Sequence, residues 1–315
     1  MQQGYDNPIS ATLIALRDQL KGSDERALDV RERLDGKTAL VTGANRGLGR
    51  AIASQLAARG ARLVMPVRGD GSEVLADVRR AGAEGELLHV DLADTDSIHR
   101  LADALKSRPP VDVLVLNAGV VPAASRATKQ GFELQNGVNF LANVLFVDRM
   151  QRDGSLRPDA RVVVVSSESH RSAEALKLDT LGVADEYGVT AVMERYSYSK
   201  LLLTAWGLEL GRRTDMTVHV MCPGPVATGI AREAPKWSQP LLEPVMQAFF
   251  APAHVGARPV VYLACAKALD GESRYFHRFD DKPPSELAAD SSAGARVLDH
   301  SLALLRERAA HPETR

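Results

Sequence analysis

The sequence predicts an α/β protein: a doubly wound parallel sheet in a single domain, preceded by an N-terminal helical arm and followed by a C-terminal extension. Short apolar runs alternate with helix-length stretches through most of the chain, which is the order of strands and helices around a parallel sheet. The runs are apolar at nearly every position, as strands covered by helices on both faces should be. They span residues 38–41, 62–67, 86–90, 111–116, 161–165 and 217–221.

Length and composition limit the classes of function. A chain of 315 residues with 45% hydrophobic side chains can bury a large core. Its 39 basic and 40 acidic residues give a net charge of −1, so no overall field attracts a polyanion or an anionic membrane. We therefore expect a small-molecule substrate and no nucleic-acid partner.

The cysteines and the first residues indicate the cellular location. Cys222 and Cys265 are the only cysteines and have no paired spacing, which argues against a disulfide framework and a cysteine zinc site. We expect two buried thiols and no metal. The N-terminus lacks the basic and apolar regions of a signal peptide, and no apolar run is long enough for a membrane span. The expected location is cytoplasmic, without a stable membrane anchor.

The domain boundaries follow from changes of pattern along the chain. Residues 1–36 are the predicted arm, because apolar residues at helical spacing are followed by a charge-rich linker. The arm either packs on its own subunit or bridges to a second one, and we favour the first. Residues 37–270 are the predicted catalytic domain, and residues 271–315 are the extension, which contains a helical pattern.

A glycine-rich turn connects the first predicted strand to the following helix. It reads Thr42-Gly-Ala-Asn-Arg-Gly-Leu-Gly49. Glycines allow positive φ and let the backbone approach a pyrophosphate, while the helix N-terminus supplies free N–H groups and partial positive charge. The candidate cofactor-binding residues here are Gly43, Asn45, Arg46, Gly47, Leu48 and Gly49.

The end of the second predicted strand indicates which dinucleotide binds. An Asp or Glu there would hydrogen-bond the ribose 2′-hydroxyl of NAD, but this chain has Val67 and Arg68. Arg68, and Arg46 in the glycine turn, can instead form charge-assisted hydrogen bonds with a 2′-phosphate. We therefore expect NADP(H), against the alternative that both arginines are ordinary surface residues.

Further motifs follow in a fixed order: Asp91-Leu92 after the third run, Asn117-Ala-Gly119 after the fourth, and Tyr196-Ser-Tyr-Ser-Lys200 on a helix. With the glycine turn, they resemble the short-chain dehydrogenase/reductase family over residues 37–270. The resemblance implies a Rossmann-type fold and hydride transfer between a nicotinamide and a carbonyl or alcohol carbon. It also implies cofactor contacts at Asp91, Leu92, Asn117, Ala118, Gly119, Tyr196, Lys200, Pro223, Gly224, Val226 and Thr228.

Tyr196 and Lys200 are the candidate acid–base pair. Four residues apart on a helix, they share one face, which Tyr198 does not. A phenol is a poor base at neutral pH, but a neighbouring ammonium and an oxidised nicotinamide favour the phenolate and can lower its pKa. The resemblance implies that Tyr196 is the general acid/base and that Lys200 also holds the nicotinamide ribose.

A serine cluster follows the fifth predicted strand, where ligands bind in open α/β sheets. Ser167 matches the family's catalytic serine, which would hydrogen-bond the substrate oxygen. Ser166 and Ser169 are its competitors.

One asparagine is also implied to be catalytic. Asn139 matches the family's helix asparagine, which helps a water chain relay protons to the lysine. Asn136 and Asn143 lie nearby, so this choice rests on the resemblance alone.

Two features are similar to the retinol-dehydrogenase-like branch: the long stretch between Ser167 and Tyr196, which includes residues 176–187, and the extended tail after Arg274. We expect an NADP(H)-dependent oxidoreductase with a bulky, mostly apolar substrate covered by this insertion. The alternatives are a carbon–carbon double-bond reductase, an epimerase, or a regulator that binds the cofactor without turnover. Both a homodimer and a homotetramer are compatible with the sequence.

Overall fold

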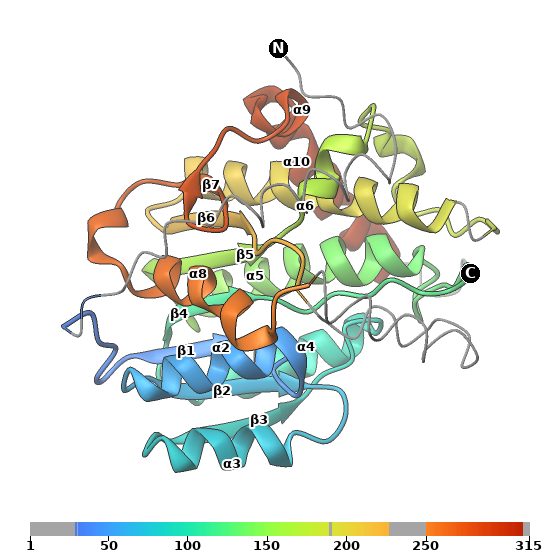
Figure 1. Ribbon diagram of the computed structural model, residues 1–315. Coiled ribbons are helices and arrows are strands. Elements are labelled where there is room, and N and C mark those ends of the chain that lie inside the picture. Colours follow the sequence, from blue (N-terminus) through green and yellow to red (C-terminus); the bar gives the residue numbers. More distant parts are fainter. Residues whose placement is uncertain (1–28, 30, 189–190, 227–249, 311–315) are drawn as a thin grey trace.

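One mostly parallel sheet organises the molecule. The computed structural model describes residues 29, 31–188, 191–226 and 250–310. Within them, eight strands lie in the order β3-β2-β1-β4-β5-β6-β7-β8 (Figure 1). All neighbouring strands are parallel except β7 and β8. The strands are β1 (Thr38–Val41), β2 (Arg62–Val67), β3 (Gly85–His89), β4 (Val111–Leu116), β5 (Leu156–Val165), β6 (Thr217–Cys222), β7 (Arg274–His277) and β8 (Asp280–Asp281).

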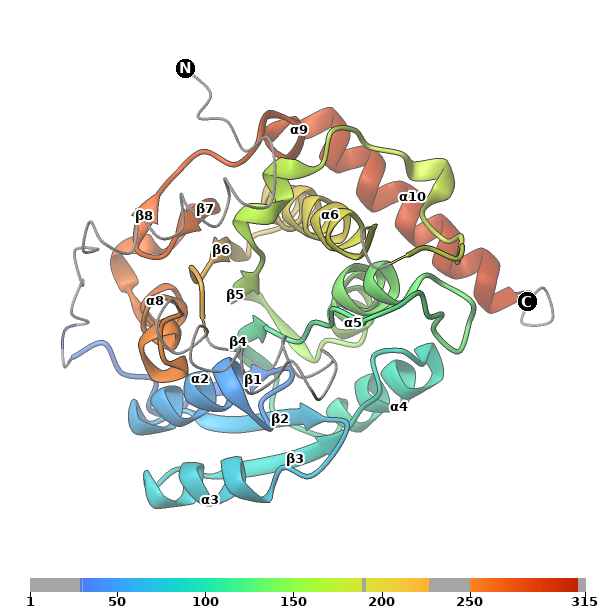
Figure 2. The same ribbon diagram turned by 45° about the vertical axis from the view of Figure 1, so that its right-hand side comes forward.

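Helices cover both faces of the sheet, as Figure 2 shows in side view. One layer holds α2 (Gly47–Ala58), α3 (Ser72–Arg80) and α8 (Ala253–Cys265). The other holds α4 (Thr95–Leu105), α5 (Ala142–Arg152) and α6 (Val192–Arg213). The predicted doubly wound α/β class is therefore confirmed.

The strands divide the core into two hydrophobic clusters. Alternate residues of one strand face opposite sides: Val162 and Val164 belong to the cluster under α5 and α6, and Val163 and Val165 belong to the cluster under α2 and α8. Most residues of β1, β2, β4, β6 and the second half of β5 are buried, which explains the continuous apolar runs in the sequence. Both cysteines are buried free thiols, as predicted.

All six predicted strands are present, and β1, β2 and β4 have the predicted ends. β3 is shifted by one residue towards the N-terminus. β5 begins at Leu156, and the prediction began only at Arg161 because the first half of this strand carries polar residues. The sequence pattern missed β7, a strand of only four residues that pairs with β6, and the two-residue β8 that pairs with β7.

The C-terminal extension, predicted from residue 271, packs onto the catalytic domain. β7 extends the main sheet, and the chain continues through α9 (Glu286–Ala289) into α10 (Ser291–Ala310). α10 packs against α6 and α5 on the outside of their layer (Figure 2). Residues 271–310 therefore complete the same folded unit. Most of the predicted N-terminal arm lies outside the described residues, but Leu34 is buried and donates its N–H to the Arg59 carbonyl.

The sheet order fixes where a site can form. β2 and β3 lie on one side of β1, and β4 lies on the other. The order in which successive strands are added to the sheet therefore reverses between β1 and β4. Ligands of open α/β sheets bind beyond the carboxyl ends of the strands at such a switch point. Among the helices in the described ranges, none combines the length and apolar character needed to cross a bilayer.

Candidate active site

The turn after β1 is shaped by glycine. Gly43 and Gly47 have φ of +67° and +52°, values that other residues rarely adopt. Gly43 donates its N–H to the Pro66 carbonyl at 3.2 Å, which places the turn beside the end of β2. A Cβ on Gly49 would collide with the Gly43 carbonyl oxygen and lie 2.6 Å from Asn117 Nδ2. The predicted glycine positions therefore have distinct structural reasons.

Gly49→Ala tests this packing. We expect the free energy of unfolding to fall by about 1–3 kcal/mol, the usual cost of overpacking, although alanine is the better helix former. The matched control is Gly69→Ala, since a Cβ on Gly69 meets no atom within 4 Å and its φ is ordinary. Urea denaturation of both variants measures the difference, and equal stability would contradict the close packing at Gly49.

The N-terminus of α2 can accept an anion. Its N-cap residue, Arg46, makes no side-chain cap, and the first turn contains no acid. A Cβ on Gly47 would meet no atom of the described residues within 4 Å, so the turn is open there. By contrast, Asp94 caps α4 by accepting from Asp96 N–H. The free N–H groups of α2 and its partial positive charge therefore fit a phosphate group.

Two arginines lie at this edge of the sheet. Arg46 and Arg68 are exposed, and neither guanidinium has a hydrogen-bond or ion-pair partner among the residues that the structure describes. Arg50, one turn further along α2, is instead bound by Asp77 and Glu73 of α3. The last residue of β2 is the buried Val67, where an NAD-binding protein would have an acid.

The loop after β4 is fastened to the turn after β1. Thr42 Oγ1 accepts the N–H groups of Asn117 and Ala118 at 3.0 and 3.1 Å, and Asn117 Nδ2 donates to the Thr42 carbonyl at 3.0 Å. Asn117 therefore fixes the loop through its side chain. Thr42 was part of the predicted turn but was not singled out as a site residue. A Cβ on Gly119 would lie 3.3 Å from Asn139 Oδ1 and 3.9 Å from Lys200 Nζ, so the loop reaches the predicted catalytic group.

Asp91 and Leu92 follow β3 at the same edge. The Asp91 carboxylate accepts the Ala93 N–H at 3.0 Å, and the Asp91 N–H donates to Ser97 Oγ. These contacts order the loop, and Leu92 is only partly buried beside it.

Tyr196, Lys200 and Ser167 come together beyond the ends of β5 and β6. Lys200 is buried, donates from Nζ to the Val165 carbonyl at 2.9 Å, and has Nζ 5.7 Å from the centre of the Tyr196 ring. The Ser167 side chain interacts with the Tyr196 phenol and accepts the Ser169 N–H. Ser166 Oγ instead lies 2.7 Å from Thr204 Oγ1 inside the core. The geometry thus favours Ser167 over Ser166.

Burial sets the protonation of this group. Burial raises the pKa of Tyr196 to about 12, although the contact with Ser167 acts in the opposite direction. Burial also lowers the pKa of Lys200 to about 8, opposed by Cys222. The sequence led us to expect that the phenol pKa can be lowered; in the protein without cofactor, burial outweighs the contact with Ser167 and the pKa is raised. Tyr196 is therefore protonated at neutral pH and ready to donate a proton.

Asn139 joins three parts of the site. It lies in a short π-helix, Asn136–Leu141, a distortion common near functional sites. Its side chain pairs with both backbone groups of Val120, at 2.7 and 3.0 Å, and donates to Ser199 Oγ at 3.2 Å. Asn143 Nδ2 donates to the Asn139 carbonyl. Asn139 thus connects the loop after β4 to α6, a role neither neighbouring asparagine fills.

The loop after β6 begins with Pro223 and Gly224. Gly224 has φ of +78° and donates its N–H to Cys222 Sγ at 3.4 Å. Val226 is buried against Gly256 of α8, so its side chain belongs to the core. The predicted contact at Thr228 lies outside the described residues.

Known proteins resemble this chain over most of its length. The protein family described as short chain dehydrogenase matches residues 37–176. Retinol dehydrogenase 14 of Mus musculus is 35% identical over 291 residues, which cover 85% of this chain and 85% of that protein. The chain belongs to the short-chain dehydrogenase/reductase family. Its similarity to retinol dehydrogenases also confirms the predicted branch.

Solved structures agree with this family. An uncharacterised protein from Mycobacterium paratuberculosis has a TM-score of 0.68 and 28% identity, and the match covers 87% of this chain and 95% of that one. A short chain dehydrogenase from Burkholderia cenocepacia, in complex with NADP, has a TM-score of 0.60 and 26% identity, covering 78% of this chain and 97% of its own. This short-chain dehydrogenase/reductase is therefore an oxidoreductase with a nicotinamide cofactor.

The insertion of this dehydrogenase/reductase is held beside the site. The Tyr187 hydroxyl donates to Glu133 at 2.7 Å, and Asp185 pairs with Arg195 at 2.5 Å. Leu181 is fully buried. Arg195 is therefore held in an ion pair within the protein, as is Arg171, which pairs with Glu168.

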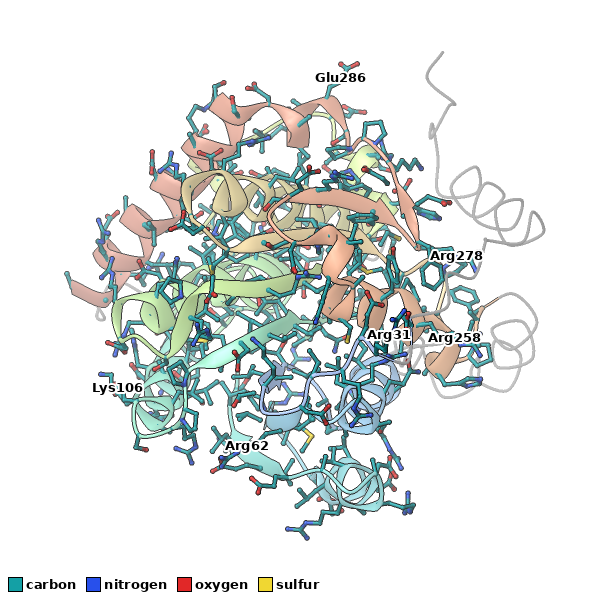
Figure 3. The ribbon with its side chains drawn as sticks, turned by 90° about the vertical axis from the view of Figure 1, so that its left-hand side faces the viewer. Arg31, Arg62, Lys106, Arg258, Arg278 and Glu286 are labelled. Atoms are coloured by element: carbon teal, nitrogen blue, oxygen red, sulfur yellow. The ribbon has the colours of Figure 1, made fainter. Side chains whose placement is uncertain are left out.

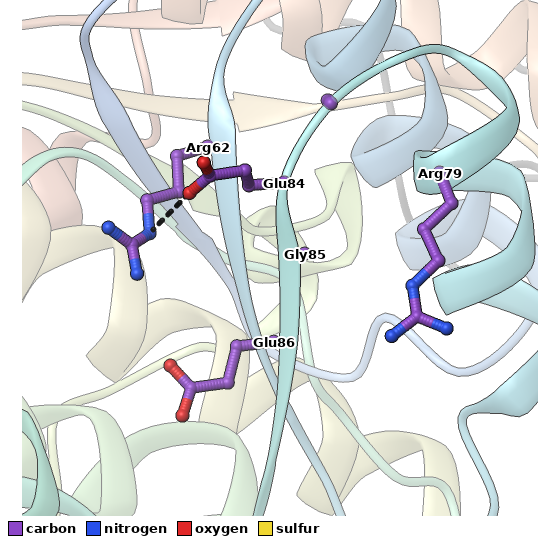
Figure 4. Close-up of a pocket in the computed structure, with 6 residues that line it drawn as sticks. Arg62, Arg79, Glu84, Gly85 and Glu86 are labelled. Carbon is purple, nitrogen blue, oxygen red and sulfur yellow. Dashed lines mark ion pairs between the residues drawn. The ribbon is translucent and has the colours of Figure 1, made fainter.

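A surface hollow elsewhere does not belong to the site. Figure 4 shows it at the amino ends of β2 and β3, where Arg62 pairs with Glu84 at 3.6 Å. The predicted catalytic residues lie beyond the carboxyl ends of the strands, at the opposite edge of the sheet. Charged side chains such as Arg62, Lys106 and Glu286 are spread over the periphery on separate elements (Figure 3).

Proposed function

We propose that this protein is an NADP(H)-dependent carbonyl reductase or alcohol dehydrogenase for a bulky, largely apolar substrate. The observation that carries the proposal is the meeting of Ser167, Tyr196 and Lys200 beside an anion-binding turn. The similarity to retinol dehydrogenase 14 supports an apolar substrate.

Each of the candidate site residues has a separate role in the proposed reaction. The bound cofactor supplies or accepts the hydride. Ser167 donates a hydrogen bond to the substrate oxygen and stabilises the negative charge that develops there. Tyr196, which is protonated at neutral pH, donates its proton to that oxygen during reduction. The Lys200 ammonium stabilises negative charge on the phenol, while Asn139 holds the loop after β4 in place.

Two exposed apolar side chains support an apolar substrate. Val183 of the insertion and Met193 of α6 are large hydrophobic side chains that are 54% and 45% exposed. Met193 lies three residues before Tyr196 and so on a similar face of α6. In this proposal, Met193 contacts the apolar part of a substrate whose carbonyl reaches Ser167 and Tyr196.

A substrate screen tests the proposal directly. Purified protein is incubated with NADPH or NADH and a series of ketones and aldehydes of increasing apolar size, and loss of reduced cofactor is followed by absorbance. We expect turnover that increases with apolar size and an alcohol product identified by mass spectrometry. A saturated carbonyl product from an unsaturated carbonyl compound would instead indicate double-bond reduction.

Arg68→Ala tests the choice of cofactor. A hydrogen bond to a charged group contributes about 1.5–3 kcal/mol, so one good arginine contact favours NADPH by about ten- to a hundredfold. We expect the variant to lose most of this preference in kcat/KM, and Arg46→Ala to lose part of it. Arg62→Ala is the control, because Arg62 is an exposed arginine at the other end of β2. A wild-type ratio near one, or an unchanged ratio in Arg68→Ala, would refute the assignment.

The position of α10 bears on assembly. Because α10 covers the outer side of α5 and α6, we propose that any homodimer or homotetramer uses another surface.

A further inference from the structure

The strand and turn at residues 275–285 lie directly against the residues that follow Ser167. We propose that this segment, here called the C-terminal clamp, fixes the position of Ser167, and that Glu168 is the positioning residue through which it acts. The inference deepens the proposed function, since it concerns the group that would bind the substrate oxygen.

Glu168 is the first point of attachment. Its carboxylate accepts the Tyr275 hydroxyl at 2.7 Å and pairs with Lys282 Nζ at 2.6 Å. Arg171 Nε also lies 3.0 Å from it, and His277 Nδ1 lies 3.5 Å from the other oxygen. The residue after Ser167 is therefore bound by side chains more than a hundred positions later in the chain.

His170 is the second point of attachment. It is fully buried, with Nδ1 2.7 Å from the Ser167 carbonyl and Nε2 3.0 Å from the Ser285 N–H. These partners assign the tautomer: Nδ1–H donates to Ser167 and Nε2 accepts from Ser285. Burial lowers the pKa of His170 to about 4, so the ring is neutral and both bonds form at physiological pH.

The charges of the clamp persist over the neutral range. Burial disfavours the Glu168 carboxylate, but its contacts with His277, Arg171 and Lys282 outweigh this and hold its pKa well below the ordinary range. Burial likewise disfavours a charged His277, yet Cys222 and Glu168 raise its pKa to about 10. Truncating Glu168 would therefore leave cations without their shared partner.

These contacts leave little freedom for Ser167. His170 holds its carbonyl, Glu168 fixes the next residue, and Ser169 N–H binds its hydroxyl oxygen at 3.2 Å. A misplacement of about 1 Å in a reacting geometry can reduce a rate about a hundredfold. Loosening the clamp should therefore lower kcat, whereas loss of a purely stabilising contact should lower only the free energy of unfolding.

Glu209 provides a matched comparison. It is a buried carboxylate on α6 that pairs with Arg212 at 3.0 Å and Arg213 at 2.7 Å. It also packs on the C-terminal region, since a Cβ on Gly294 of α10 would lie 3.1 Å from Glu209 Cβ. Glu209 thus shares the burial and ion pairs of Glu168 but has no contact with the Ser167 turn.

The test compares Glu168→Gln with Glu209→Gln in the full chain. Amide hydrogen exchange of residues 166–172 should speed up in Glu168→Gln and stay at the wild-type rate in Glu209→Gln. With a carbonyl substrate, kcat should fall about 10- to 100-fold in Glu168→Gln while the Kd for NADPH changes little. Tyr275→Phe, which removes one donor and keeps the buried ring, should show the same changes to a smaller degree.

Three results would overturn the clamp: equal exchange of residues 166–172 in both Gln variants, an equal loss of kcat in both, or a rise of kcat in Glu168→Gln. The last would mean that the carboxylate acts by its charge, because its removal leaves Arg171 and Lys282 to stabilise a negative substrate oxygen. If wild-type protein reduces no carbonyl compound, the proposed function fails, while hydrogen exchange still decides whether the clamp exists. If Glu168→Gln does not fold, Tyr275→Phe and Glu209→Gln carry the comparison.

Discussion

Tyr196→Phe is expected to reduce kcat by about 10²–10⁴-fold, the usual contribution of a positioned acid or base. The substitution removes only a hydroxyl from a ring that lies beside Lys200 Nζ and interacts with Ser167. Binding of NADPH should persist, because the turn after β1 and the N-terminus of α2 are untouched. Steady-state kinetics with the best carbonyl substrate, together with titration of NADPH fluorescence, measures both quantities.

Tyr198→Phe is the matched control, from the same motif two residues along α6. The Tyr198 hydroxyl donates to the Lys177 carbonyl at 2.8 Å and faces the insertion rather than Ser167. We expect its kcat to stay near that of wild type. A Tyr196→Phe variant with near-normal kcat, or a Tyr198→Phe variant that loses as much, would remove Tyr196 from the mechanism.

Much of the fold could be predicted because its strands are buried on both faces. The run at Val162–Val165 is apolar at every position, which is typical of a covered strand, and the glycines around Gly43 lie between a predicted strand and a predicted helix. The missed strand shows the limit of this reasoning. β7 has only four residues, two of them charged or polar, and its pairing with β6 depends on residues more than fifty positions apart.

The site was predicted less completely, for a physical reason. The order of the motifs predicted Tyr196, Lys200, Ser167 and Asn139 as site residues, and the structure places all four near the same strand ends. The attachment of Glu168 to Tyr275 and Lys282 could not be inferred, because nothing local marks contacts between such distant residues. The direction of the Tyr196 pKa shift also depends on burial, which a sequence does not reveal.

Lys200→Met is expected to reduce kcat strongly without unfolding the protein. Methionine has nearly the length of lysine, but it lacks the ammonium that stabilises a phenolate, so kcat should fall about 10²-fold or more. NADPH should also bind more weakly if Lys200 holds the nicotinamide ribose. An effect on kcat alone would contradict that second role.

The stability of Lys200→Met should depend on pH in a defined direction. In wild type, the pKa of Lys200 is lowered from 10.5 to about 8, a shift that corresponds to about 3 kcal/mol against the charged form in the folded state. Below pH 8 the ammonium is charged in both states, so the fold carries this whole cost. Between pH 8 and 10.5 the unfolded chain keeps a proton that the folded protein has released, so wild-type stability gains with rising pH. The variant lacks this group.

At pH 7, the variant avoids the free-energy cost of burying the ammonium, and this offsets the loss of the hydrogen bond to the Val165 carbonyl. The unfolding free energies of wild type and variant should therefore agree within about 1 kcal/mol at this pH. As the pH rises to 10, the variant should become the less stable protein. Urea denaturation of both proteins at pH 7, 8, 9 and 10 measures the difference. A difference that stays constant, or changes in favour of the variant, would show that Lys200 is not a buried ammonium with a lowered pKa.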